Sequence, residues 1–435
     1  MSTALSLKVV FIAHYFPPIN SSGAKRVEAM SKYLAAARHT VSVITTRKSS
    51  ADGAFSEAPP AGVNVIELDW LGRHSPSVEG GEHFEPMYGG APSLKRRFKD
   101  LVMRLLGQLP DPRLPFALSF ASPWLAARAR TALSGADVVI GTSPPWPMLL
   151  AAAIAKRRFR IPCILDYRDH FSECHEMPGG RFAKWLEKKI DRRLVGSADH
   201  VVAISDPMAG YYRTMSDHVS TILNGYDHEI LEAARARSRP GAPGIVTIRY
   251  MGIVSHGRVP HNFLKALVQL KESAPQKFEH LRVEFYGSAS LVADALRDQY
   301  PSVASAFHFN SAVPYAMSLQ LVIEADYLLF AETSSKATLS ARGILTTKLF
   351  EYIGSGRPVL GDISTDTLAG SLLTESGGHH VVGDHVGVFL DALRQEAFFV
   401  RRPDEISAGV WKLSRQAQAL QYADLAGQIA RNSRI

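Results

Sequence analysis

Short runs of β-branched and other apolar residues alternate with amphipathic stretches along the chain, a pattern typical of βαβ units with a parallel sheet. Between the first two runs, apolar residues recur at three- and four-residue intervals, which predicts a helix over about 24–37. The first half therefore predicts seven strands, at 9–13, 41–45, 63–68, 137–141, 163–166, 200–204 and 221–223.

The same alternation restarts after a stretch rich in Ala, Arg, Pro and Gly, so we expect an interdomain linker at 226–244 between domains at 1–225 and 245–414. Helices are expected at 261–271 and 346–354. The strands expected in the second half are 245–250, 283–286, 307–309, 327–330, 359–360 and 381–382. The prediction is an α/β fold with two doubly wound parallel sheets. Because ligands of such sheets bind outside the carboxyl ends of the strands, we also expect a ligand-binding cleft.

Composition narrows the class of protein. The chain has 435 residues, 46% hydrophobic and 21% charged, which is typical of a folded protein with two domains. Its two cysteines, Cys163 and Cys174, exclude a secreted disulfide scaffold and favour the cytoplasm. The longest apolar run, 148–155, is far shorter than the roughly 20 residues that span a bilayer, and the N-terminus lacks a basic leader, so we expect neither a transmembrane segment nor export. A net charge of +8 favours anionic partners without choosing among nucleic acid, acidic lipids and sugar nucleotides.

The loop after the first strand, "HYFPPINSSGAKR", contains Ser22, Gly23 and Arg26 at the start of a helix. Small residues there let backbone amides approach an anion, although a plain strand-to-helix turn explains them as well. The chain has a single G-x-G, at 354–356, with Val359 in place of the third glycine of a dinucleotide motif, so NAD chemistry is not expected.

The stretch "DYRDHFSECHE" follows a strand at the edge where open sheets bind ligands. We interpret it as a polar loop whose carboxylates, Asp166 and Asp169 among them, hydrogen-bond a hydroxylated ligand. A zinc site at His170, Cys174 and His175 is the weaker alternative, because no second ligand cluster accompanies it. No D-x-D pair occurs in the chain, so the metal and diphosphate clamp of many nucleotide-sugar enzymes is absent.

Two cationic residues of the second half are candidates for binding phosphate. Arg258, in the loop "MGIVSHGR" after Gly252, can donate two parallel hydrogen bonds to a diphosphate or can be a solvated loop arginine. Lys348 and Glu351 lie on one face near the start of a helix. A lysine there is unfavourable unless an anion is bound, which indicates a phosphate site, whereas the alternative is a surface ion pair.

Two basic amphipathic stretches, 94–109 and 182–194, carry apolar residues on one face among several Lys and Arg. We interpret the first as a helix on an anionic membrane surface. For both, the alternative is a helix packed on its own domain with a solvated basic face.

Eight motifs in order resemble the GT-B glycosyltransferases of the family 4 type, in particular their bacterial surface-polysaccharide branch. They are "HYFPPINSSGAKRVEAMSKYL", "DVVIGTSPPWP", "DYRDHF", "ADHVVAIS", "ILNGYD", "RYMGIVSHGR", "VPYAMSLQLVIEADYLLF" and "TTKLFEYIGSGRPVL". The resemblance covers nearly the whole chain. It implies two Rossmann-like domains that face a cleft, with a final helix at about 422–432 crossing back to the first domain in a segment of about 415–435.

The resemblance also implies residue roles. Arg258 and Lys348 would bind the donor diphosphate and act in catalysis together with Asp169, which would face the transferred sugar. Glu351 would accept hydrogen bonds from the ribose, and Val313 would lie against the base. Three first-domain residues would form the acceptor-side loop: Ser22, Gly23 and Arg26. Five further residues would complete the donor site: Gly252, Gly287, Gly343, Leu345 and Thr346.

One position departs from the family pattern. The E-x7-E motif requires a glutamate eight residues before Glu351, and this chain has Gly343 there. The missing carboxylate normally contacts the sugar, so the identity of the donor sugar stays open, and backbone amides at 343–346 are the expected replacement.

The sequence thus predicts a retaining, metal-independent and cofactor-independent glycosyltransferase that moves a hexosyl or related sugar from a nucleoside diphosphate sugar to a glycan or lipid-linked acceptor in polysaccharide or glycoconjugate synthesis. Fixed cations and a helix N-terminus can stabilise the departing diphosphate without a metal. We expect the protein in the cytoplasm, peripheral on the inner membrane face through 94–109. The alternative is a catalytically silent GT-B partner subunit, suggested by Gly343. Nucleic-acid binding is not expected, because no recognised module is present.

Overall fold

The chain divides into two compact units. The computed structural model describes residues 6–19, 21–48, 58–69, 105–109, 111–174, 179–239, 241, 243–255, 257–332, 343, 345–402 and 404–433. The first unit comprises Met1–Leu223, Thr338–Gly343 and Arg415–Ile435, and the second comprises Asn224–Ala337 and Ile344–Ser414. The range 226–244, expected as a linker, includes helix α8 (His228–Arg237), which packs on the second unit's α12 (Tyr315–Glu324).

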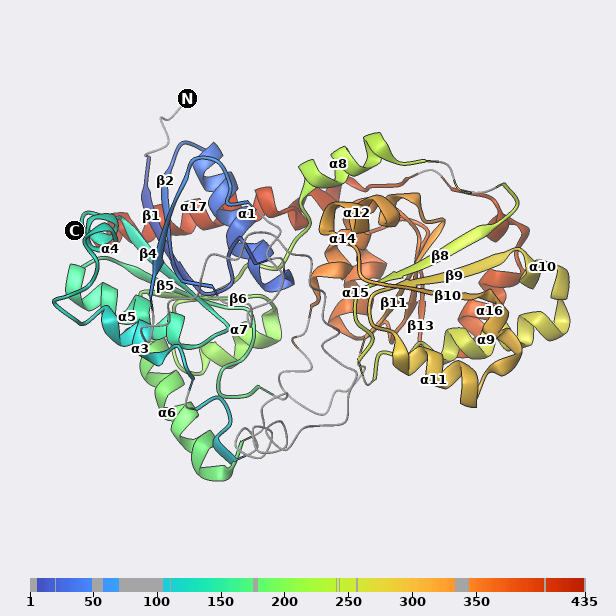
Figure 1. Cartoon of the computed structure of the whole chain (residues 1–435), viewed down its shortest axis with the longest axis horizontal. Helices are drawn as coiled ribbons and strands as arrows, with labels where there is room; N and C mark the ends of the chain where they lie inside the picture. The colour runs from blue at the N-terminus through green and yellow to red at the C-terminus, as the bar shows by residue number, and fades with distance from the viewer. Residues whose placement is uncertain are drawn as a thin grey trace. The chain divides into compact units, whose positions relative to one another are not determined.

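The first unit is built on a seven-stranded parallel sheet of order β3-β2-β1-β4-β5-β6-β7 (Figure 1). Each of the seven expected strands is present, although the last begins two residues earlier than predicted. Their bounds are β1 Lys8–Ala13, β2 Thr40–Thr46, β3 Val63–Leu68, β4 Val138–Ser143, β5 Cys163–Tyr167, β6 His200–Ala203 and β7 Val219–Thr221.

Helices cover both faces of this sheet, as alternate residues of β1 show. Val9 and Phe11 pack in a core with α1 (Ser22–Ala36) and α17 (Arg415–Asn432), whereas Val10 and Ile12 pack in a second core with α5 (Pro147–Phe159). Because α17 packs against α1, the predicted return of the final helix to the first domain is confirmed, and the helix begins seven residues earlier than expected. The remaining described helices of this unit are α3 Leu114–Ser119, α4 Ala127–Leu133, α6 Arg181–Ser197 and α7 Asp206–Arg213.

The second unit is built on a six-stranded parallel sheet of order β10-β9-β8-β11-β12-β13. All six expected strands are present, at β8 Val246–Met251, β9 Leu281–Tyr286, β10 Phe307–Asn310, β11 Tyr327–Ala331, β12 Val359–Asp362 and β13 Val381–Gly383. Its further helices are α9 His261–Ser273, α10 Pro275–Glu279, α11 Ser290–Asp298, α14 Thr347–Ser355, α15 Leu368–Glu375 and α16 Val386–Arg394, with 3-10 turns η2 Pro301–Ala306, η3 Glu396–Phe399 and η4 Ala408–Leu413. The predicted α/β fold with two parallel sheets is therefore confirmed.

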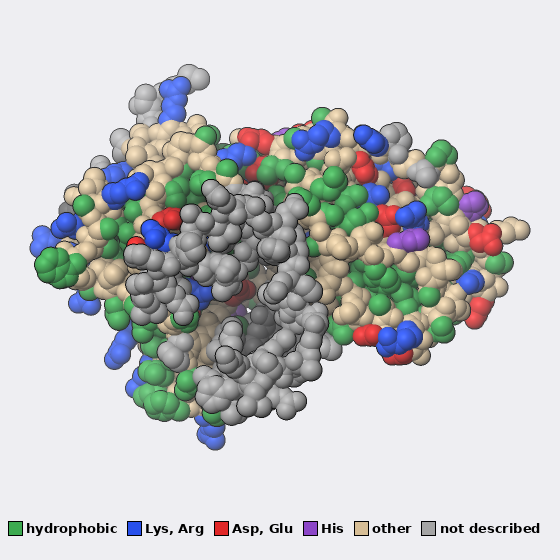
Figure 2. Space-filling view, viewed as in Figure 1, with side chains coloured by type: hydrophobic (Ala, Val, Ile, Leu, Met, Phe, Trp, Pro, Cys, Tyr) green, Lys and Arg blue, Asp and Glu red, His purple; other side chains and the backbone are tan. Residues whose placement is uncertain are grey.

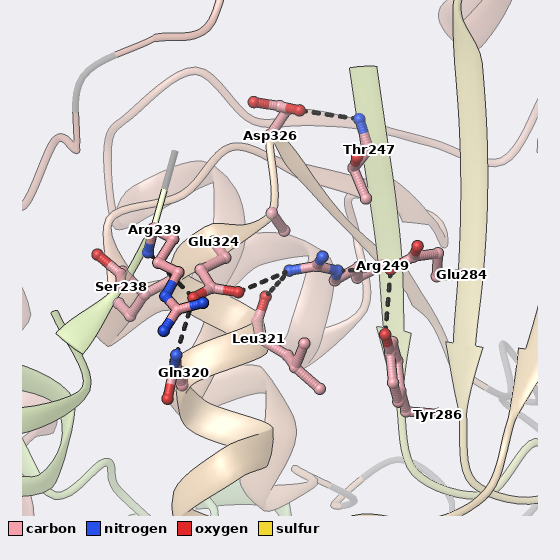
Figure 3. A network of polar contacts seen from close by, with 12 residues as sticks. Ser238, Arg239, Thr247, Arg249, Glu284, Tyr286, Gln320, Leu321, Glu324 and Asp326 are labelled. Atoms are coloured by element: carbon pink, nitrogen blue, oxygen red, sulfur yellow. Dashed lines mark hydrogen bonds and ion pairs between the residues drawn. The ribbon is translucent and has the colours of Figure 1, made fainter. Parts of the chain in front are cut away.

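A polar network fastens α12 to the sheet of the second unit (Figure 3). Arg249 of β8 donates Nε to the Glu284 carboxylate of β9 at 2.8 Å and Nη1 to the Leu321 carbonyl of α12 at 2.8 Å. Burial by itself would raise the pKa of Glu284, but the hydrogen bond and charge of Arg249 lower it. This network is structural, and it fixes the helix that carries Tyr315.

Candidate donor site at the carboxyl edge of the second sheet

Two glycines bring three strand ends of the second sheet together. Gly252 follows β8 with φ +100°, and Gly287 follows β9 with φ +121°, conformations that favour glycine. A Cβ atom on Gly287 would lie 2.6 Å from the Gly252 carbonyl oxygen. The Gly252 amide donates to Tyr286 and the Gly287 amide to Asn310, at 2.7 and 3.0 Å. Both predicted donor-site glycines therefore lie at the edge where open sheets bind ligands.

Lys348 is the second residue of α14, and its side chain points back to β8. Its Nζ donates to the Tyr250 hydroxyl at 2.6 Å and lies 4.0 Å from the centre of that ring, while the Tyr250 hydroxyl donates to the Ile253 carbonyl at 3.2 Å. Among the described residues, no carboxylate lies within ion-pair distance of Lys348. Burial lowers the pKa of Lys348 to about 7, and the charge of Arg258 acts in the same direction, against the opposing charges of Glu332 and Glu351.

Arg258 forms an ion pair with Glu332, the residue that follows β11. The carboxylate is buried and the guanidinium is about one-fifth exposed. Glu332 was not among the predicted site residues, although its place directly after an apolar strand marks the same sheet edge as Gly252. Tyr250 was also missed, because a strand tyrosine is ordinarily a core residue.

Glu351 lies one turn after Lys348 and accepts a hydrogen bond from the Tyr315 hydroxyl of α12 at 2.9 Å. Half-buried Val313 lies two residues before Tyr315, so α12 and α14 bring the predicted base and ribose contacts to one region of the second unit. Tyr315 was not predicted as a site residue. The one feature of the sequence that points to Tyr315 is its hydroxyl group two residues after Val313, in the motif "VPY".

The segment before α14 carries the remaining predicted donor residues. Thr346 is the N-cap of α14, and Leu345 is buried, with its carbonyl accepting from the Asn224 side chain at 3.3 Å. Gly343 is buried and belongs to the part of the chain grouped with the first unit, where a Cβ atom would lie 2.9 Å from Ser205 Oγ. A glutamate at Gly343 would therefore require this neighbour to move.

In the first unit, Ser22 and Gly23 begin α1, as predicted. Arg168 donates to the Gly23 carbonyl and, at 3.2 and 3.0 Å, to the Ser143 and Pro144 carbonyls. The Ser22 side chain lies outside the described residues. These contacts fix the turn between β1 and α1 against the ends of β4 and β5.

Arg26 is a structural residue in α1. Its guanidinium pairs with the Asp166 carboxylate through two hydrogen bonds, of 3.1 and 3.0 Å, and donates to the Leu223 and Ile222 carbonyls at 2.6 and 2.9 Å. The Tyr422 hydroxyl of α17 donates to Asp166 at 2.5 Å. Burial by itself would raise the pKa of Asp166, but Arg26 lowers it. The predicted ligand contact of Asp166 is therefore wrong, because this buried carboxylate is hydrogen-bonded to Arg26 and Tyr422 within the first unit.

Two further residues of the stretch after β5, His170 and Glu173, also contact side chains of the first unit. His170 is buried beside the rings of Tyr211 and Tyr212, and Glu173 pairs with Lys188 at 2.7 Å. Asp169 is exposed directly after the carboxyl end of β5. His175 lies outside the described residues, which contain no group of three His, Cys, Asp or Glu side chains arranged to hold a metal.

The structure thus brings together Arg258, Lys348 and Glu351 with the two edge glycines in the second unit. The acceptor-side residues and Asp169 lie in the first unit. None of the helices in the described ranges is long and apolar enough to cross a bilayer.

Comparisons with known proteins match both the first unit and the whole fold. Residues 23–225 match the model of the glycosyl transferase 4-like domain. Sucrose-phosphate synthase from Thermosynechococcus elongatus is 14% identical with a TM-score of 0.62, covering 97% of this chain and 98% of that one. A glycosyltransferase from Rickettsia africae is 10% identical (TM-score 0.60, 98% and 99% covered), and HepE from Anabaena in complex with UDP and glucose is 11% identical (0.56, 97% and 100%). No curated protein sequence matches significantly. These findings confirm the resemblance to GT-B glycosyltransferases of the family 4 type.

Proposed function

We propose that this chain is a glycosyltransferase that transfers a sugar from a nucleoside diphosphate sugar with retention at the anomeric carbon. The match of residues 23–225 to a glycosyl transferase 4-like domain and the likeness of the fold to sucrose-phosphate synthase support the proposal. The acceptor we propose is a glycan or lipid-linked molecule of surface polysaccharide or glycoconjugate synthesis, at the cytoplasmic face of a membrane. One observation carries the proposal: a half-buried lysine with a lowered pKa lies at the start of α14, beside an arginine at the ligand edge of the sheet.

A lysine ammonium group withdrawn from water costs free energy unless an anion compensates its charge. Lys348 has a phenol hydroxyl as its hydrogen-bond partner, and the N-terminus of α14 adds partial positive charge around it. A diphosphate would supply the missing negative charge to Lys348, and the forked guanidinium of Arg258 can bind two of its oxygens. This charge pattern supports an anionic donor over a neutral sugar.

The chemistry assigned to these residues is stabilisation of the leaving group. The bond between the anomeric carbon and the diphosphate oxygen breaks, and the bond pair remains on the diphosphate, where negative charge accumulates. The acceptor hydroxyl oxygen attacks from the face that the diphosphate leaves, and its proton passes to a departing phosphate oxygen. We propose that Arg258 and Lys348 stabilise this charge without a metal ion.

Donor selectivity is assigned to the two helices beside the diphosphate. Glu351, oriented by Tyr315, would accept hydrogen bonds from the ribose hydroxyls, and Val313 would contact the base. A uridine donor is the first choice, because HepE from Anabaena was captured with UDP. Since Gly343 has no carboxylate, the sugar hydroxyls are assigned to backbone amides at 343–346, with Asp169 facing the sugar.

The test begins with thermal shifts of the full chain against UDP-, GDP- and dTDP-sugars, because a ligand that binds only the folded state raises the Tm. Turnover of the selected donor is then measured with and without EDTA. Donor binding with metal-independent product formation supports the proposal. Activity lost in EDTA and restored by Mg²⁺ or Mn²⁺ contradicts metal independence. Donor binding without turnover, in the presence of a range of glycan and lipid-linked acceptors, favours the silent partner subunit.

A further inference from the structure

Helix α6 carries exposed aromatic side chains that lie outside the candidate donor site and the acceptor-side loop. Phe182 is 74% exposed and Trp185 is 50% exposed, and their rings stack with centroids 5.7 Å apart. Large exposed aromatic residues in a group are unusual on a soluble domain and indicate a contact surface. The surface lies at the outer edge of the first unit, where Figure 2 shows hydrophobic and basic side chains side by side.

The charges of α6 are divided between its two faces. Its two acidic residues, Glu187 and Asp191, are buried and bonded inward: Glu187 accepts from the Gln108 amide at 2.6 Å, and Asp191 accepts from the hydroxyls of Tyr167 and Ser172 at 2.8 and 2.7 Å. The exposed residues of the helix include five cations, Arg181, Lys188, Lys189, Arg192 and Arg193. Lys188 is paired with Glu173 at 2.7 Å, and the other four cations remain on an outer face to which α6 itself contributes no exposed acid.

Helical spacing places these cations and both aromatic residues on one face. Lys189 Nζ lies 3.9 Å from the centre of the Trp185 ring, so the aromatic and cationic groups are in direct contact. The segment beside the start of α6 adds apolar surface, because the Leu105 carbonyl accepts from the Gly180 amide at 2.9 Å and both Leu105 and Leu106 are exposed. We call Leu105, Leu106 and the exposed face of α6 the α6 surface.

We infer that the α6 surface docks on an anionic lipid bilayer. Aromatic side chains within a ring of Lys and Arg match the interface of such a bilayer, where the rings enter the headgroup region and the cations contact phosphate groups. Charge complementarity favours this partner, since four exposed cations, Arg181, Lys189, Arg192 and Arg193, face outward in addition to Lys188, which is paired with Glu173. The surface overlaps the predicted membrane helix 94–109 only at Leu105 and Leu106, and residues 94–104 lie outside the described part. It does not depend on catalysis, so it is tested separately from sugar transfer.

The test is sedimentation of the full chain with vesicles of phosphatidylcholine alone or mixed with phosphatidylglycerol. The wild type should bind the mixed vesicles and bind much less to phosphatidylcholine. Phe182→Ser/Trp185→Ser and Lys189→Glu/Arg192→Glu should each lower the partition coefficient about tenfold or more, because both insertion and charge attraction contribute. Since all four side chains are exposed on the helix, both variants should keep the wild-type melting temperature.

Matched controls use the same substitutions elsewhere in the first unit. Trp124→Ser removes a tryptophan that is more exposed than Trp185, and Arg128→Glu/Arg130→Glu reverses two exposed charges on α4. Neither control should change vesicle binding. The inference is overturned if wild type does not bind mixed vesicles or if the controls weaken binding as much as the α6 variants. It is also overturned if the aromatic variant binds mixed vesicles like the wild type, because the two rings would then not enter the bilayer and the cations alone would account for binding to an anionic surface.

Discussion

Two cations of this protein, buried Arg26 in the first unit and half-buried Lys348 in the second, have different electrostatic surroundings. Arg26 has a carboxylate partner with two hydrogen bonds, and this ion pair raises its pKa although burial by itself would lower it. Lys348 is hydrogen-bonded to a neutral phenol, and burial lowers its pKa to about 7. The ion pair of Arg26 is complete within the fold, whereas the positive charge of Lys348 can be neutralised by an anionic ligand.

The comparison predicts that breaking the first pair has the largest effect on stability. Asp166→Ala leaves Arg26 buried without its carboxylate and removes the acceptor for Tyr422, so it should lower the free energy of unfolding by about 3–5 kcal/mol. Denaturant unfolding followed by circular dichroism measures this. The control Asp298→Ala, which removes one of the two carboxylate partners of exposed Arg297, should leave the unfolding transition unchanged. An unchanged transition for Asp166→Ala would show that the buried pair does not hold the first unit together.

Lys348 should show the opposite pattern, with a large effect on activity and little on stability, because its removal leaves no partner charge behind. Arg258→Ala removes the cation paired with the buried Glu332 carboxylate, so it should lower stability as well as activity. Lys348→Ala and Arg258→Ala should each lower kcat by about a hundredfold or more, with a smaller change in donor affinity, because the charge they stabilise grows in the transition state. Steady-state kinetics measure kcat and KM separately. Lys265→Ala, at an exposed lysine of α9, is the matched control and should retain wild-type kinetics. Wild-type kcat in both site variants would remove the catalytic assignment.

The lowered pKa of Lys348 predicts a pH dependence that Arg26 does not have. Between pH 7 and the ordinary lysine value of 10.5, the unfolded chain binds a proton that the folded chain lacks, so this group makes stability rise with pH across that window. A bound diphosphate would raise the pKa of Lys348. Donor binding would then take up a proton, and its affinity should fall by up to about tenfold per pH unit above pH 7.

This linkage is measured by calorimetry with a nucleoside diphosphate sugar, whose diphosphate does not titrate in this range. Proton uptake should appear in buffers of different ionisation enthalpy. Lys348→Met keeps the aliphatic stem and removes the titrating group, so its donor affinity should be lower and independent of pH between 7 and 9. A wild-type affinity that does not change with pH would mean that Lys348 does not meet the donor anion.

The smallest effect is expected at Glu351. Its proposed bonds to the ribose are equal in the ground and transition states, so Glu351→Ala should raise KM by about tenfold and change kcat less. Tyr315→Phe removes the hydrogen bond that orients Glu351 while the carboxylate remains, and should raise KM by a smaller factor. Kinetics with matched ranges of donor concentration decide this. A kcat loss as large as that of Lys348→Ala would place Glu351 in the chemical step instead.

The sequence determined the secondary structure and its order, because apolar periodicity is set by which side of each element faces the core. The thirteen expected strands are present, and the helix expected at 346–354 differs by one residue at each end from α14 at Thr347–Ser355. The sequence also placed Arg258 in a loop after a strand and Lys348 near the start of a helix, and the resemblance to a known family assigned both residues to one diphosphate.

Only the tertiary structure decided which polar residues are engaged inside the protein. Asp166 and Asp169 are three residues apart in one motif, yet the first is buried against Arg26 and Tyr422 and the second is exposed. Glu332 meets Arg258 across 74 residues, and Tyr250 meets Lys348 across 98. The strand pattern does not contain these pairings, because burial and charge compensation depend on neighbours that the chain supplies from distant segments.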